Sequence, residues 1–184
     1  MGTHTIRIAV LYATAQGSTR GIAEFIGSQL TGRGAAVEIA DVEHAPDLSG
    51  FDAVVLGSAV HNMAWLPSAA EFVNAHRDEF TARDTWLFSV GLGPALRGPH
   101  GRWFGRQVPS AIAALRDSIT PRDYTAFAGR MERAGSPLWA RLVYLAMGGG
   151  RYGDLRDWDA VRAWSERIAH TLRLPQSITP SSHQ

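Results

Sequence analysis

The 184-residue sequence predicts an α/β fold, in which a doubly wound parallel sheet of five strands carries helices on both faces. Short apolar runs alternate along the chain with segments of helical periodicity, which is typical of parallel sheets. These runs are apolar on both faces, as expected of strands buried between two helical layers. Hydrophobic residues make up 45% of the chain, which is enough for a sizeable core in one domain.

Five strands and four helices follow from these patterns. The expected strands are residues 6–12, 37–40, 53–57, 85–90 and 124–129. The expected helices run from about 19 to 30, from about 67, from about 109 to 116 and from about 157 to 172. Pro67 suits the first turn of a helix, and Gly32 and Gly34 end the first helix. In the strand order 2-1-3-4-5, the first, third and fourth strands are neighbours, so the loops that follow them meet at one edge of the sheet.

The first of these loops has the composition of an anion-binding site. It lies between the first strand and the first helix and consists of Thr14, Ala15, Gln16, Gly17, Ser18 and Thr19. The first amides of a helix have no intrahelical partner, and the helix dipole favours negative charge there. Gly17 lets the backbone close around a ligand, and the hydroxyls can bond phosphate oxygens or cap the helix. An ordinary capped turn is the alternative.

The loops after the third and fourth strands supply the other candidate contacts. Ser58, Ala59, Val60, His61 and Asn62 follow the third strand, and Ser89, Val90, Gly91, Leu92 and Gly93 end or follow the fourth. Trp65 could stack on a ligand ring, or pack as a hydrophobic staple at the start of the next helix. His61 could donate a proton to a bound substrate, or be an ordinary surface histidine.

The composition excludes several classes of site. Because the chain has no cysteine, it has no disulfide, thiolate metal site or cysteine nucleophile. It also has no lysine, which excludes a Walker phosphate loop. The net charge of +1 and the scattered charges argue against nucleic-acid binding, and the acidic residues show no metal-ligand spacing. No apolar run spans a bilayer and no signal-peptide core begins the sequence, so we expect a cytoplasmic protein.

The segment 137–147 is apolar on one side at helical spacing. It is expected either to pack over the edge of the sheet or to form a surface helix that contacts a membrane, a quinone or another subunit. We expect one domain over residues 1–174, with an apolar insertion at about 134–150, and a loose tail over 175–184.

The first loop resembles the phosphate loop of the flavodoxin-like family, which has the form Thr/Ser-x-Thr-Gly-x-Thr after the first strand. Thr14, Gly17 and Thr19 match this pattern, and Gln16 replaces the middle hydroxyl residue. Within the superfamily, the chain resembles the branch that includes the menaquinone-dependent protoporphyrinogen oxidases. The residues that carry this second likeness are 57–60, 68–73, 127–130, Trp139, 147–149 and 157–158.

The resemblance implies an FMN cofactor, with its phosphate on the first loop and its ring against the second and third loops. A deazaflavin stays open as an alternative cofactor. The implied activity is an oxidoreductase that passes electrons or hydride between a small organic substrate and an acceptor such as a quinone. Two alternatives are a one-electron carrier with a protein redox partner and a scaffold without flavin. A net charge of +1 disfavours the carrier, because it provides little steering toward basic partners.

Overall fold

The computed structural model describes residues 5–95, 107–131 and 153–175. Its main sheet has the strand order β2-β1-β3-β5-β6, with all neighbours parallel. These strands are β1 (Arg7–Ala13), β2 (Ala36–Asp41), β3 (Ala53–His61), β5 (Asp84–Gly91) and β6 (Asp123–Ala128). A sixth strand, β4 (Ala64–Trp65), adds to β3 in the antiparallel sense. The five parallel strands therefore have the expected 2-1-3-4-5 order, and β4 is an addition to it.

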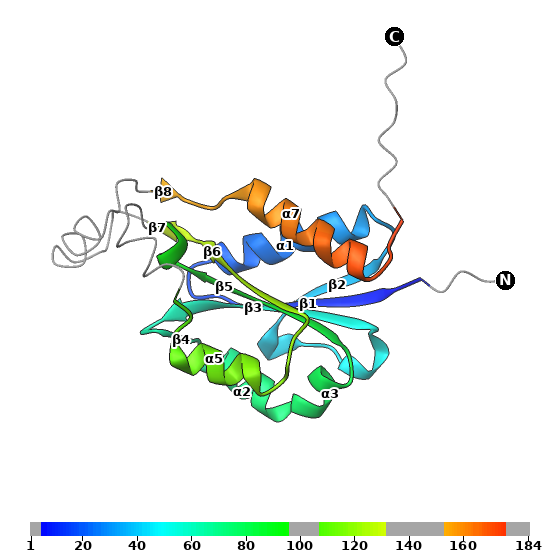
Figure 1. Cartoon of the computed structure of the whole chain (residues 1–184), viewed down its shortest axis with the longest axis horizontal. Helices are drawn as coiled ribbons and strands as arrows, with labels where there is room; N and C mark the ends of the chain where they lie inside the picture. Colours follow the sequence, from blue (N-terminus) through cyan, green and yellow to red (C-terminus); the bar gives the residue numbers. More distant parts are fainter. Residues whose placement is uncertain (1–4, 96–106, 132–152, 176–184) are drawn as a thin grey trace, which may run out of the picture.

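Helices cover both faces of this sheet (Figure 1). One face carries α1 (Ser18–Thr31) and α7 (Trp158–Thr171). The opposite face carries α2 (Pro67–Ala75), α3 (Arg77–Thr81) and α5 (Ser110–Asp117). Short 3-10 turns lie in the described connections: η1 (Val42–His44), η2 (Leu48–Gly50) and η3 (Gly93–Ala95).

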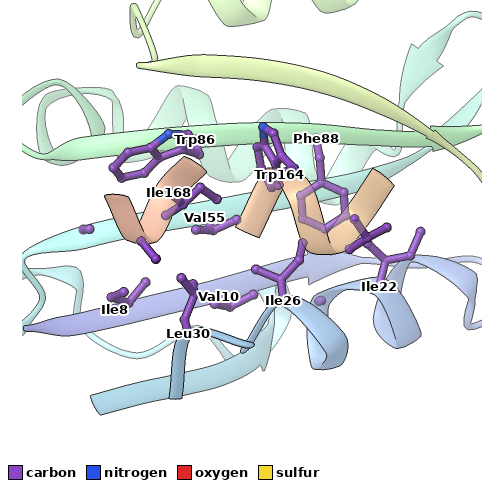
Figure 2. Close-up of a cluster of buried hydrophobic side chains, with 14 of the residues drawn as sticks. Ile8, Val10, Ile22, Ile26, Leu30, Val55, Trp86, Phe88, Trp164 and Ile168 are labelled. Atoms are coloured by element: carbon purple, nitrogen blue, oxygen red, sulfur yellow. The ribbon is translucent and has the colours of Figure 1, made fainter. Parts of the chain in front are cut away.

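The core on the α1 face is formed by alternate residues of the strands and one stripe of each helix (Figure 2). Ile22 and Ile26 of α1 and Trp164 of α7 are fully buried there. Phe88 of β5 packs edge-on against Trp164, with ring centroids 5.9 Å apart. The Phe88 ring also lies directly over Gly57 of β3, where a Cβ would collide with it. Glycine at this position is therefore a packing requirement.

The core on the α5 face uses the remaining strand residues. Val54 and Leu56 of β3 are fully buried and contribute to this cluster. Val73 of α2, Phe80 of α3 and Ile112 of α5 cover them from the helical layer. Each central strand thus buries side chains on both faces, which explains its continuous apolar sequence.

The structure corrects the expectation that residues 58–65 form a loop. β3 continues to His61, Asn62 and Met63 turn the chain, and β4 returns along β3. Asn62 and Met63 have φ angles of 50° and 61°, the left-handed conformation that a two-residue hairpin turn requires at both positions. Asparagine favours such a turn but methionine does not, so residues 62 and 63 only weakly indicate a hairpin.

Three further elements, one helix and two short strands, were not expected from the sequence. α3 follows α2 almost directly, and β7 (Arg130–Met131) pairs with β8 (Gly153–Asp154) as a small antiparallel sheet. The predicted apolar segment 137–147 and the tail after 175 lie outside the described residues. In the part of the chain described, no helix is long and apolar enough to cross a membrane.

Candidate functional site

The loop between β1 and α1 ends in an open helix N-terminus. Gly17 precedes the helix with φ 83°, and no side chain caps the first turn. The Thr14 hydroxyl accepts a hydrogen bond from the Gly17 amide at 2.9 Å, which holds the loop in a tight turn. Ala15, Gln16 and Gly17 are exposed and Ser18 is half-buried. The amides at the start of α1 are therefore available to an anion from solvent.

Thr19 adds a hydroxyl to this helix start. Its side chain is 1% exposed, and its Oγ1 is the only buried side-chain nitrogen or oxygen without a hydrogen-bond partner in the described residues. A buried hydroxyl without a partner costs about 1–3 kcal/mol. An oxygen-rich ligand at the helix start would supply the missing partner. The residues of this loop therefore fit a phosphate group.

Residues that follow β6, far from this loop in the sequence, form one wall of the site. Gly129 follows β6, and a Cβ there would lie 3.6 Å from Ser18 Oγ and 3.1 Å from a Val90 methyl. Its carbonyl accepts a hydrogen bond from the Leu155 amide at 3.2 Å. Arg156 then reaches the first turn of α1, where a Cβ added at Gly21 would be 2.5 Å from its Nη1.

Arg156 is held in place by two interactions. Its guanidinium donates two hydrogen bonds to the Asp154 carboxylate and lies 4.5 Å from the Trp158 ring centroid. These bonds hold the pKa of the Asp154 carboxyl below its ordinary range. Gly129 and Arg156 were not among the predicted site residues. Only the pairing of sequence-distant segments brings them to the loop, so the local sequence gave no signal for them.

The turn after β3 and the segment after β5 present apolar side chains at the same edge. Met63 is 63% exposed and Leu92 is 39% exposed, whereas most large apolar side chains of the described chain are buried. His61 and Asn62 are also exposed on this turn. A flat ring bound at this edge would find apolar contact with Met63 and Leu92.

Trp65 does not lie where the stacking interpretation placed it. It is 5% exposed and packs in the core on the α5 face. Its indole N–H donates to Ser89 Oγ at 2.7 Å, and Tyr124 Oη lies 2.8 Å from the same oxygen. Because β4 pairs with β3, the Trp65 ring is directed beneath the sheet edge, so it offers no free face to a ring at the rim.

Some of the other predicted residues have side chains already hydrogen-bonded within the fold, and others line a cavity. Ser58 is buried, and its hydroxyl bonds the Ala59 carbonyl and the Leu66 amide. Ser89 is equally committed to Trp65 and Tyr124. A cavity of about 340 Å³ brings together residues of the second and third predicted loops: Val60, Asn62, Ser89, Gly91, Leu92 and Gly93. The parallel sheet therefore brings the two loops together, as the strand order predicted.

Known proteins resemble this chain along most of its length. It is 23% identical over 183 residues to the protoporphyrinogen IX dehydrogenase [quinone] of Escherichia coli K12, covering 92% of this chain and 98% of that protein. An archaeal flavodoxin superposes with a TM-score of 0.59 at 14% identity, covering 91% of this chain and 99% of its own. Rubredoxin oxygen:oxidoreductase from Desulfovibrio gigas superposes with a TM-score of 0.57 at 15% identity, covering 91% of this chain and 36% of that chain.

The family assignment rests on a direct match. The model of the flavodoxin domain matches residues 9–145, which is most of the chain and includes all three loops. The match and the flavodoxin folds point to FMN as the cofactor. The uncapped start of α1 and the buried Thr19 hydroxyl fit its phosphate. On this evidence the chain belongs to the flavodoxin domain family and is a flavin-binding redox protein.

Proposed function

We propose that this protein is an FMN-dependent oxidoreductase that passes reducing equivalents between a small organic substrate and a quinone. The observation that carries the cofactor assignment is the buried, unpartnered Thr19 hydroxyl at the uncapped start of α1. The quinone is suggested by the Escherichia coli relative, whose name specifies a quinone and which matches this chain along nearly its whole length.

The phosphate would be held mainly by neutral groups. A phosphate monoester carries about −1.5 to −2 charges near neutral pH, and each helix amide donates one hydrogen bond to it. The hydroxyls of Thr14, Ser18 and Thr19 lie on the same loop and would supply further donors. Arg20 is directed along α1, where it pairs with Glu24 at 2.8 Å. Arg156 lies against the first turn of α1 but is paired with the Asp154 carboxylate, so both nearby guanidinium groups already have an acidic partner.

The ring would lie at the carboxyl edge between the β3–β4 turn and the segment after β5. Met63 and Leu92 would contact its apolar surface, and backbone groups of 58–62 and 89–93 would reach its polar edge. Electron and hydride transfer are the chemistry of the flavin itself, and the chain supplies binding and orientation. His61 is exposed beside this edge and is our candidate for donating a proton to the substrate.

A one-electron carrier is the second candidate. A carrier relies on an electrostatic field to steer its protein partners. A net charge of +1 provides little such field, whereas a small neutral quinone needs none. The enzyme is therefore the function that we favour.

The first experiment is a visible absorption spectrum after FMN is added and the excess removed. We expect retained flavin bands that weaken in the Thr14→Ala and Thr19→Ala variants and remain in Thr85→Val, which removes a buried hydroxyl elsewhere. The reduced, FMN-loaded protein is then mixed anaerobically with menadione. Rapid transfer of both flavin electrons to one equivalent of menadione supports the enzyme. A protein that takes up one electron per flavin and does not reduce menadione would refute it in favour of a carrier. A folded protein that retains no flavin would contradict the cofactor assignment.

A further inference from the structure

The cavity of about 340 Å³ lies on the α5 face of the sheet. It reaches from the β3–β4 turn past the end of β5 to α5 and β6, with Ser89, Ile112 and Tyr124 in its wall. The phosphate loop opens α1, which covers the opposite face (Figure 1). The cavity and the phosphate site are thus separated by the sheet, although both open at its carboxyl edge.

The hydrogen-bonded side chains Trp65, Ser89 and Tyr124 at the cavity wall have one donor hydrogen more than their mutual hydrogen bonds require. Ser89 Oγ lies 2.7 Å from Trp65 Nε1 and 2.8 Å from Tyr124 Oη. The indole can only donate, and each hydroxyl carries a single hydrogen. The three side chains therefore have three donor hydrogens but form only two hydrogen bonds with one another. Within residues 5–95, 107–131 and 153–175 they make no further side-chain hydrogen bond. One hydroxyl hydrogen is left for an acceptor outside the trio.

That hydrogen belongs to Ser89, which is buried, or to Tyr124, which is half-buried, and both residues line the cavity. Ser89 is 2% exposed, and burial raises the pKa of the Tyr124 phenol above its ordinary value, despite the opposing Ser89 hydrogen bond and the nearby Arg116 charge. Tyr124 consequently remains a neutral donor at physiological pH. A buried donor without a partner is costly, so a ligand with an acceptor oxygen is favoured at this point.

The rest of the wall is mainly apolar. Val60, Met63, Leu92, Pro109, Ile112 and Ala126 contribute most of it. A cavity of this size falls in the range of small-molecule sites, about 300–1,000 Å³. The wall therefore favours an uncharged ligand with an apolar body and a carbonyl oxygen. Among the described residues no carboxylate or cation lines it, so this part of the wall offers no partner to a charged substrate.

The geometry points to a quinone-binding site in this cavity, with the surplus hydrogen of the Ser89–Tyr124 pair donated to a quinone carbonyl. This assignment rests on the proposed function and locates the acceptor next to the flavin ring, with which it would share the Met63 and Leu92 side chains. The flavin ring is also apolar and carries carbonyl groups, so it is the competing occupant that an experiment must separate from the quinone.

The test measures equilibrium binding of menadione to the protein with and without FMN. The double variant Ser89→Ala/Tyr124→Phe removes both hydroxyls, and we expect about tenfold weaker menadione binding, the value of one hydrogen bond. Ala126→Phe keeps the hydroxyls and fills the cavity from the edge strand, and should weaken binding by more than tenfold. Thr125→Val is the control, because neighbouring strand residues point to opposite faces.

FMN affinity is measured for each variant, so that the two proposals fail separately. Menadione binding that falls in the cavity variants, with FMN affinity unchanged, supports the site. Binding that survives both cavity variants overturns it, even if FMN is retained and the reduced flavin passes its electrons to menadione. If FMN excludes menadione, or if the cavity variants weaken FMN instead, the cavity belongs to the flavin ring and the assignment is overturned. Menadione binding without any FMN binding would support the site while refuting the cofactor assignment.

Discussion

Replacing Thr19 by valine tests the phosphate site through two effects of opposite sign. Valine has nearly the shape of threonine but lacks the hydroxyl, which is buried without a partner at the start of α1. Leaving such a group unsatisfied costs about 1–3 kcal/mol, so the flavin-free variant should be more stable than the wild type by about 1 kcal/mol. For a chain of this length, that corresponds to a rise of about 2–4 °C in Tm.

The same change should weaken FMN binding. A hydrogen bond to a charged group contributes about 1.5–3 kcal/mol, so the dissociation constant should rise roughly 10- to 150-fold. The assays are thermal unfolding without flavin and fluorescence titration with FMN. Stability and affinity are thus predicted to move in opposite directions, which a loss of folding cannot imitate.

Thr85 provides a matched control. It is also 1% exposed, but its hydroxyl donates to the Phe80 carbonyl at 2.9 Å. Thr85→Val should therefore lower stability, by about 1–3 kcal/mol, and leave FMN affinity unchanged. The reasoning is refuted if Thr19→Val destabilises the flavin-free protein and changes FMN affinity less than twofold.

Three further predictions address the ring edge, the core and the cavity wall. Met63→Gly should raise Tm slightly, because removing the strain of a left-handed non-glycine residue stabilises the fold by about 1–2 kcal/mol, and the greater entropy of the unfolded chain cancels only part of this gain. The same change should lower FMN affinity. A lower Tm in thermal unfolding would contradict this prediction. Gly57→Ala drives a Cβ into the Phe88 ring and should cost about 1–3 kcal/mol in urea unfolding, with an unchanged midpoint counting against the packing argument. Burial raises the Tyr124 pKa, so the phenol loses its proton at a lower pH in the unfolded chain than in the folded protein. The stability of the wild type should therefore fall as the pH rises above about 10. Tyr124→Phe should show a smaller fall between pH 9 and 11, and parallel curves would exclude a contribution from this phenol.

The strands, the main helices and the tight loop before α1 could be predicted from the sequence because each depends on local rules. A strand buried on both faces must be apolar at every position, which made β1, β3 and β5 recognisable. A glycine and hydroxyl residues between a strand and a helix predict an anion site whatever the rest of the chain does. Once the strand order was predicted, the meeting of the three loops followed from the topology.

The tertiary structure decided what the local patterns left open. Whether Trp65 stacks on a ligand or enters the core depends on the β3–β4 hairpin and on Ser89, 24 residues away. Arg156 reaches α1 only because β8 pairs with β7 and the Leu155 amide bonds the Gly129 carbonyl just after β6. The surplus hydrogen in the cavity arises from three side chains on three strands, so no single stretch of sequence contains it. Residue types and periodicity are local properties, whereas hydrogen-bond partners and cavity walls are set by segments far apart in the chain.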